Sequence, residues 1–237
     1  MATDMEFMNR VFHAGLRRDL ARALVTLGDG QRRPEEREAL VQHLGLMLDL
    51  LHHHHTSEDR GLWPLARRRA PDLAPQLDRM EAEHAAVGVA IASTRSAAAR
   101  YASVEDTGGG AAAAAELREA LAALRDALLP HLDHEETEVM PRVVRALSRQ
   151  DWSALTRREL SDRRSLTLAG QGLVWSGEGL DRQQSAEFDR QVPRLMRWFV
   201  EKRYGPAYRR RVALAFPPPA PAGGASSSPG ASHVEES

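Results

Sequence analysis

Two stretches of the chain place a histidine and a glutamate four residues apart on what the apolar pattern predicts to be the buried face of a helix. In the second stretch, leucines recur at spacings of three and four over residues 117–128, and the same face continues with His131, Glu135 and Val139. Burying imidazole and carboxylate groups costs several kcal/mol unless they are paired or bind a metal ion. Side chains at i and i+4 lie one above the other on a helix, so both can reach the same ion. The pattern therefore predicts a metal site.

The first stretch repeats this arrangement earlier in the chain at a constant offset. His54 corresponds to His131 (131 − 54 = 77), and Glu58 corresponds to Glu135 (135 − 58 = 77). A proline follows each glutamate after the same interval. Such a repeat indicates two structurally equivalent helices that contribute equivalent ligands.

His54 belongs to a run of four histidines at residues 52–55, and it continues the leucine face of its own helix. A competing frame uses His55 with Asp59 and has no counterpart in the second copy. We therefore prefer His54 with Glu58, and the choice between the two frames stays open. The remaining histidines are interpreted as surface residues or as an outer layer around the site: His43, His52, His53, His55, His134 and His233.

Each stretch is preceded by a helix that carries one inward-facing histidine. The expected helices span residues 7–27, with His13, residues 34–63, residues 75–101, with His84, and residues 111 to beyond Pro141, with a kink there. Two such helix pairs form an all-α, up-and-down four-helix bundle, which would bring six side chains together. These six candidate metal ligands are His13, His54, Glu58, His84, His131 and Glu135.

The bundle is expected to occupy residues 1–149, followed by a helical extension or lid at residues 150–216 that packs on it. Within the extension, the sequence predicts a short helix at 151–164, a glycine-punctuated loop at 170–179 that contains Trp175, and a helix at 180–204. One or two further turns follow at 208–216. The tail at 217–237 is rich in Pro, Ala, Gly and Ser, cannot bury enough apolar surface to order itself, and is expected to be disordered.

Composition limits the classes of function. The net charge of −1 argues against a general attraction to nucleic acid or to an anionic membrane. A nucleic-acid or phosphate contact is disfavoured because arginines interleaved with acids usually form a solvated face; the arginines concerned are Arg157, Arg158, Arg163, Arg164, Arg194, Arg197 and Arg209–Arg211. The absence of cysteine excludes disulfides and thiolate ligands. No stretch approaches the ~20 apolar residues of a spanning helix, and no signal peptide is visible. We therefore expect a cytoplasmic protein without nucleic-acid or membrane partners.

The chain resembles the hemerythrin-like, or HHE cation-binding, domains. The residues that carry the resemblance are His13, residues 54–58, Glu83-His84 and residues 131–136, with Leu-Trp-Pro at 62–64 and Val-Met-Pro at 139–141. The resemblance covers about residues 5–147. It implies a four-helix bundle that holds two non-haem iron ions, with the six candidate ligands bound to them and with Glu58 and Glu135 bridging.

Two positions depart from the oxygen carriers of that family. The carriers have a second histidine four residues before the one at position 84, and here that position is Met80. Their last acidic ligand also lies one residue further along, which would select Glu136, whereas the internal repeat favours Glu135. The missing histidine implies an open coordination position with Met80 as an apolar wall beside it, and it argues against simple reversible oxygen carriage.

The donor set of four imidazoles and two carboxylates suits iron first and manganese second. We expect a di-iron protein that binds and reacts with O2, peroxide or NO at an open, carboxylate-bridged site. Its predicted activity is that of an oxidoreductase, which decomposes peroxide or oxidises a small organic substrate beneath the extension. Trp152, Trp175 and Trp198 would then line or cover the mouth of the site. The alternative is a non-catalytic module that senses or stores O2, NO or iron.

Overall fold

The computed structural model describes residues 2–28, 32–104, 109–159 and 163–217, and these contain helices and no strand. The first seven α-helices are α1 (Ala2–Thr26), α2 (Pro34–Ser57), α3 (Trp63–Arg69), α4 (Ala74–Ala102), α5 (Gly110–His134), α6 (Met140–Ala146) and α7 (Arg149–Glu159). The last three are α8 (Arg163–Ser176), α9 (Arg182–Gln191) and α10 (Arg194–Ala215). A 3-10 turn at Pro71–Leu73 leads into α4.

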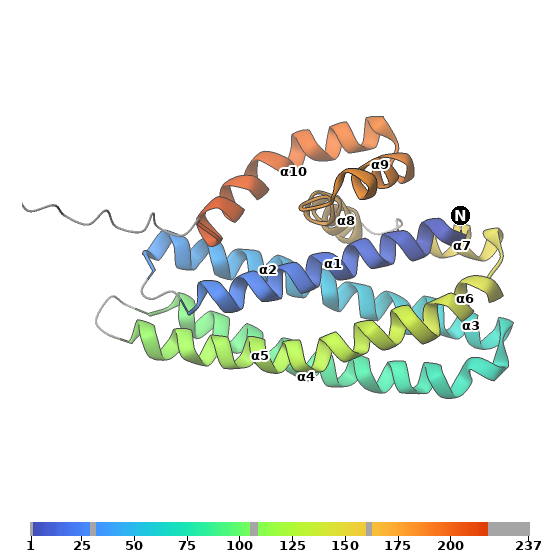
Figure 1. Ribbon diagram of the computed structural model, residues 1–237, viewed down its shortest axis with the longest axis horizontal. Helices are drawn as coiled ribbons and strands as arrows, with labels where there is room; N and C mark the ends of the chain where they lie inside the picture. The colour runs from blue at the N-terminus through green and yellow to red at the C-terminus, as the bar shows by residue number, and fades with distance from the viewer. Residues whose placement is uncertain (1, 29–31, 105–108, 160–162, 218–237) are drawn as a thin grey trace, which may run out of the picture.

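The central architecture is a four-helix up-and-down bundle, as the sequence predicts (Figure 1). Its helices are α1, α2 continued by α3, α4, and α5 continued by α6, and neighbours in the bundle run antiparallel. The leucine faces meet in one core, where a fully buried leucine stabilises the fold by about 1.5–3 kcal/mol relative to an exposed one. Residues that are at most 1 % exposed there include Leu16, Leu20, Leu44, Met47, Leu51, Val87, Leu117, Leu121, Leu124 and Leu128.

Two of the bundle helices pass through a wider, π-helical turn. One such turn spans Glu58–Leu62 between α2 and α3, and the other spans Glu135–Val139 between α5 and α6. Each is closed by a backbone bond to the carbonyl five residues earlier, from Trp63 to Glu58 and from Met140 to Glu135. The expected end of the second helix near residue 63 is therefore wrong, because the chain stays helical to Arg69.

The prolines give a physical reason for these wider turns. Pro64 and Pro141 stand at the start of α3 and α6, directly after the π-helical turns. Within a regular α-helix a proline lacks the N–H donor and its ring clashes with the carbonyl four residues earlier. A π-helical turn loosens the backbone at that point, so the helix continues instead of breaking.

The C-terminal extension packs on the bundle in two places. α7 lies at the end of the bundle near α3 and α6, where Arg69 forms an ion pair with Asp151. α8 and α10 lie across α1 and α2, and α9 joins them on the outside (Figure 1). The expected short helix at 151–164 corresponds to Arg149–Glu159, and residues 160–162 lie outside the described part of the chain.

The glycine-rich segment at 170–179 is not the loop that the sequence predicts, because α8 runs through it to Ser176. Its glycines serve close packing. A Cβ on Gly170 would lie 2.6 Å from the Tyr204 ring, and one on Gly172 would lie 2.9 Å from Leu50. Each of these two glycines costs about 1 kcal/mol of helix propensity relative to alanine, and the close contacts of α8 with α10 and α2 offset that cost. Only Gly179, with φ 77°, needs a left-handed backbone, after the helix has ended.

The rest of the extension is helical, but the expected helix at 180–204 is broken at Pro193 into α9 and α10. α10 then runs without interruption to Ala215, so the expected gap between residues 204 and 208 does not occur. Residues 218–237 of the expected tail lie outside the described residues. None of the described helices combines the length and the apolar character needed to cross a membrane.

Candidate metal centre

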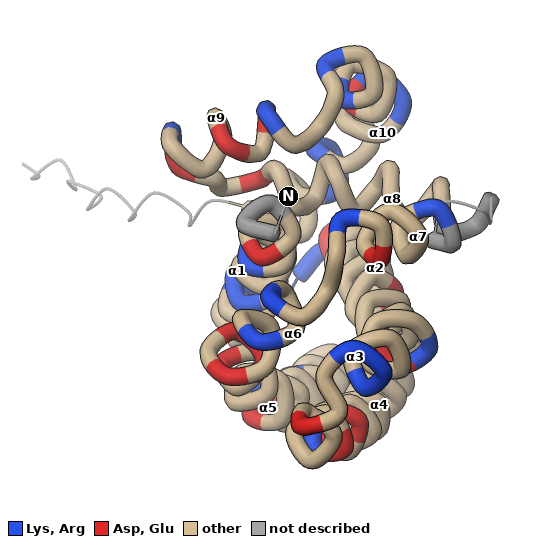
Figure 2. Tube along the Cα trace, turned by 90° about the vertical axis from the view of Figure 1, so that its right-hand side faces the viewer, with Lys and Arg blue, Asp and Glu red and all other residues tan. Residues whose placement is uncertain are grey.

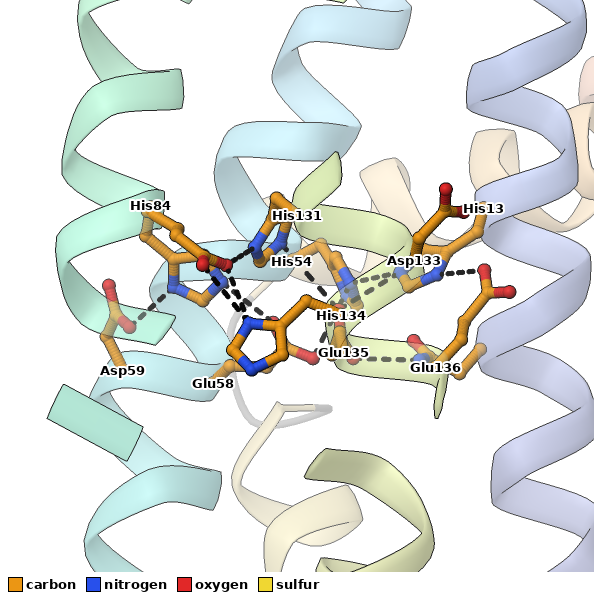
Figure 3. A network of polar contacts seen from close by, with 12 residues as sticks. His13, His54, Glu58, Asp59, His84, His131, Asp133, His134, Glu135 and Glu136 are labelled. Carbon is orange, nitrogen blue, oxygen red and sulfur yellow. Dashed lines mark hydrogen bonds and ion pairs between the residues drawn. The ribbon is translucent and has the colours of Figure 1, made fainter. Parts of the chain in front are cut away.

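Two groups of ligand-type side chains meet in the interior of the bundle (Figure 3). One consists of His13 from α1, His54 from α2 and Glu135 from the second π-helical turn; the other consists of His55 from α2, His84 from α4 and His131 from α5. In each group one ligand atom per residue lies within 4.8 Å of the others, a spacing at which the three can hold one ion. The two groups lie side by side.

In the first group the ligand atoms converge closely. The Nε2 atoms of His13 and His54 are 3.2 Å apart, and His13 Nε2 lies 3.4 Å from Glu135 Oε2. Both His13 and Glu135 are completely buried. Without an ion, these two imidazole nitrogens can share at most one hydrogen; a cation between them would accept both lone pairs.

In the second group the rings pack directly on one another. The imidazole of His55 stacks on that of His84, with centroids 4.0 Å apart and an angle of 10° between the planes. The His131 ring meets both edge-on, at 4.9 Å and 4.8 Å. The Nε2 atoms of all three are buried and have no hydrogen-bond partner among the described residues. Leaving such atoms unsatisfied costs about 1–3 kcal/mol each, a cost that metal binding would remove.

Glu58 and Glu135 lie between the two groups. Glu58 Oε1 is 3.5 Å from His54 Nε2, whereas its Oε2 is 3.6 Å from His84 Nε2. Glu135 Oε2 is 3.4 Å from His13 Nε2 and 3.7 Å from His131 Nε2. Each carboxylate thus faces one histidine of each group, which is the position that a bridging ligand requires.

A second layer of carboxylates orients three of the histidines. Nδ1 of His13 lies 2.7 Å from Glu136 Oε1, Nδ1 of His84 lies 2.6 Å from Asp59 Oδ1, and Nδ1 of His131 lies 3.2 Å from Glu83 Oε2. An N–H bond to a carboxylate on one side of the ring leaves Nε2 as the basic nitrogen that points to a metal. Asn9 orients Glu135 in a similar way, because its side-chain amide donates a hydrogen bond to Glu135 Oε1 at 2.8 Å.

Burial keeps the imidazoles in the form that binds metals. It lowers the pKa of His54 and His55 well below the ordinary value, and that of His84 and His131 to about 4. Burial and the neighbouring Glu135 carboxyl raise the pKa of Glu58. A cation between the two carboxyls would act in the opposite direction and favour both in the charged form. The residues therefore fit a pair of metal ions.

The structure brings all six predicted ligands together and adds His55. The prediction of a surface or outer position for His55 is wrong, because it is only 5 % exposed and stacks on His84. Neighbouring helical residues point about 100° apart, and here His54 faces one group while His55 faces the other. The alternative pairing of His55 with Asp59 could have identified His55 as a site residue, because the Asp59 carboxylate contacts the His84 ring.

Two further predictions concern residues around the site: the choice between Glu135 and Glu136 as a ligand, and the position of Met80. The structure places Glu135 in the first group and sets Glu136 behind His13, where it also accepts a bond from Arg17. Met80 is fully buried in an apolar cluster with Trp63. That it borders an open coordination position stays a prediction.

The other histidines divide between an outer layer and unrelated positions. His134 is in the outer layer, 3.1 Å from Glu83, the carboxylate that also faces His131. His43 is neither a surface residue nor part of that layer, because it is completely buried and bonded to Asp19, 2.6 Å away. His233 lies outside the described residues.

A cavity of about 260 Å³ reaches the first group from the end of the bundle. His54 and Glu58 form part of its wall, together with Asn9, Phe12, Ser57 and Trp152. A water molecule has about 30 Å³ of liquid volume, so this space exceeds what O2 or peroxide needs and admits a small organic molecule. Helix α7, which carries Trp152, is the part of the extension that covers it.

The three tryptophans expected at the mouth of the site therefore have three different positions. Trp152 lines the cavity, as predicted. Trp175 is fully buried and packs at 5.2 Å against Phe12, whose ring is 4.6 Å from that of His54. Trp198 lies on α10 with 59 % of its surface exposed and does not line the cavity, so the prediction is wrong for this residue.

Comparison with known protein families supports the metal-binding assignment. The family described as hemerythrin HHE cation binding domain matches residues 10–143, more than half of the chain. All six predicted ligands and His55 lie within that range. No curated protein and no solved structure matches the chain.

Proposed function

Because the chain belongs to the hemerythrin HHE cation-binding domain family, whose members bind metal cations, we propose that its two ligand groups hold a pair of iron ions. His13 and His54 would bind one ion; His55, His84 and His131 would bind the other. The mixture of imidazole and carboxylate donors without thiolate suits iron, with manganese second.

The placement of Glu58 carries this proposal. Its two carboxylate oxygens face different groups, at 3.5 Å from His54 and 3.6 Å from His84. A carboxylate that served one ion alone would have no reason to stand between two sets of buried nitrogens. With Glu135 on the other side, it would act as the shared anion that offsets the repulsion between two close cations.

We further propose that the site reacts with O2 or peroxide and that the protein is an oxidoreductase. Two iron ions, when bound, supply the electrons and coordination positions that this chemistry requires. The chain supplies fixed ligands, a largely apolar surrounding and the cavity at His54 and Glu58. The volume of about 260 Å³ favours a small organic substrate beside the centre over a site for a diatomic gas alone.

The ligand donors are unequal between the two groups, which also supports reactivity. The first group has two histidines and the second has three, with the two glutamates shared. Fewer protein donors leave more positions for exogenous ligands, and the cavity opens at the group with fewer histidines. O2, peroxide or a substrate would therefore bind on the His13–His54 side.

The test uses the full-length, iron-loaded and reduced protein. We expect two irons per chain and sustained consumption of O2 or peroxide when an external reductant is present. Glu135→Ala should abolish both iron binding and the consumption of O2 or peroxide. Glu138→Ala is the matched control, because the Glu138 side chain is 66 % exposed.

Two results would count against the proposal. Absence of bound iron would overturn it as a whole. A single, stoichiometric uptake of O2 without turnover would overturn the enzymatic part and favour a sensing or storage module.

A further inference from the structure

Helix α10 carries a concentrated positive charge that the chain as a whole does not show. It contains seven basic residues and one acidic residue, a formal charge of +6. The whole chain has a net charge of −1, so the remaining residues sum to −7. Figure 2 shows the basic positions of α10 at the edge of the molecule farthest from α4 and α5. Two of its arginines pair with acids, Arg197 with Asp189 and Arg209 with Glu201.

The same helix exposes large apolar side chains near its N-terminal end. Leu195 is 78 % exposed, Trp198 59 % and Phe199 61 %. Their spacing of three and four residues places them on one face of the helix, and Lys202 continues that face. The opposite face is the one that packs inward, through residues such as Val200 and Tyr208. The exposed apolar side chains therefore point away from the rest of the protein.

Cations border these apolar side chains and remain available to a partner. Arg194, Lys202, Arg203 and Arg210 are exposed and form no ion pair within the described part of the chain. Lys202 lies over the Trp198 ring, with its Nζ 6.0 Å from the centroid. The surface thus combines aromatic, aliphatic and cationic groups within a few turns of one helix.

We propose that this outer face of α10, from Arg194 to Arg210, binds the surface of a membrane that contains anionic phospholipids. Lysine and arginine at the level of the phosphates, with tryptophan, phenylalanine and leucine in the boundary of the acyl chains, are the features of an interfacial helix. The proposal is independent of the function of the metal centre. It concerns binding at the membrane surface, which requires no spanning helix.

Charge and chemistry select this partner over two others. A second copy of the chain would bring +6 against +6 across a two-fold interface, which disfavours self-association through this face. Nucleic acid would satisfy the cations but would leave Leu195 in water, because aliphatic side chains cannot stack on bases as aromatic rings do. An anionic bilayer satisfies both kinds of side chain. Each cation near such a surface strengthens binding roughly fivefold.

The experiment measures binding of the full-length protein to vesicles of phosphatidylcholine alone and of phosphatidylcholine with phosphatidylglycerol. We expect sedimentation with the anionic vesicles only, weakened by salt, together with a blue shift of tryptophan emission. That shift reports on Trp198, because Trp63, Trp152 and Trp175 are at most 5 % exposed.

Two double variants separate the contributions of the apolar and the cationic side chains to vesicle binding. Leu195→Ser with Phe199→Ser removes apolar contacts and keeps Trp198 as the probe; it should lower vesicle affinity at least tenfold. Its matched control is Val25→Ser with Val89→Ser, at positions 64 % and 70 % exposed, which should bind as the parent does.

The second double variant, Lys202→Gln with Arg203→Gln, should lower vesicle affinity about twenty-five-fold, because each cation contributes roughly fivefold. The matched control is Arg118→Gln with Arg145→Gln, two exposed positions outside α10. Circular dichroism and iron content should be the same in every variant.

Three outcomes would overturn the proposal. They are an absence of binding to anionic vesicles, equal binding by the Leu195→Ser, Phe199→Ser variant, and equal losses in the control variants. Retention on duplex DNA without vesicle binding would identify nucleic acid, and not a membrane, as the partner of this face. A dimer in sedimentation equilibrium that the apolar double variant dissociates, again without vesicle binding, would identify the face as a self-interface.

Discussion

Replacing Asp19 by asparagine is expected to loosen the C-terminal extension from the bundle. Asp19 is completely buried in α1. Its Oδ2 accepts hydrogen bonds from His43 Nε2 in α2 and Trp175 Nε1 in α8, both at 2.6 Å, and its Oδ1 accepts one from Arg18 Nε at 2.8 Å. One carboxylate therefore joins two bundle helices to the extension.

The magnitude follows from these three bonds. Removing one member of a buried charge pair costs about 3–5 kcal/mol. Asparagine keeps the shape and one acceptor oxygen, so the two bonds to Oδ2 can survive without their charge, while the amide N–H groups face Arg18. We expect Asp19→Asn to lower the free energy of unfolding by about 3 kcal/mol. For a chain of this size that corresponds to a decrease in Tm of roughly 6–12 °C.

The effect should depend on pH in a defined direction. Burial opposes ionisation of Asp19, but the hydrogen bonds from His43 and Arg18 outweigh it and hold the pKa of Asp19 well below its usual range. A carboxyl whose pKa is depressed by folding stabilises the folded state fully above its unfolded pKa of about 3.9. The difference in the free energy of unfolding between the parent and Asp19→Asn should therefore have its full size above about pH 5 and shrink as the pH falls below 4.

A double-mutant cycle with Trp175→Phe isolates the contact between bundle and extension. Urea unfolding of the parent, both single variants and the double variant gives the coupling energy, which we expect to exceed about 1 kcal/mol. Asp49→Asn is the matched control, because Asp49 forms an exposed ion pair with Arg95 that should be worth less than about 1 kcal/mol. Additive effects of Asp19→Asn and Trp175→Phe, within about 0.5 kcal/mol, would refute the reasoning.

Three further predictions concern the metal centre. Glu58→Ala and Glu135→Ala should each lose both metal ions, because each carboxylate faces both histidine groups; a variant with two irons by elemental analysis would show that its carboxylate is not shared. His55→Ala should lower the iron content more than His52→Ala, an exposed control in the same run, and equal contents would remove His55 from the ligand set. Met80→His, one turn before His84, should add a donor to the ion of the His55–His84–His131 group and change the optical spectrum; an unchanged spectrum would show that Met80 does not border the site.

The bundle and most of the site could be predicted from the sequence because helical periodicity is local. Apolar residues at spacings of three and four define the buried face of each helix, whatever the helix packs against. A polar residue on that face, such as His131 with Glu135 one turn later, is then conspicuous. The second copy at a constant offset supplied the pairing between helices that no single stretch contains.

His55 shows where that reasoning ends. The sequence of a single helix defines one inward direction, so choosing His54 excludes its neighbour. In the folded protein α2 borders two ligand groups at once, and two adjacent histidines face different groups. The direction called inward depends on the neighbouring helices, whose positions are a tertiary property.

The extension depended on tertiary contacts more than the bundle did. The glycines of α8 predict a loop from propensity alone, yet they allow the close approach of Tyr204 and Leu50. Likewise Asp19 and Trp175, 156 residues apart, meet only because α8 lies across α1. Local periodicity determines which residues are buried in a helix. Which buried polar groups become partners depends on contacts between residues distant in the sequence, and these form only when the helices pack.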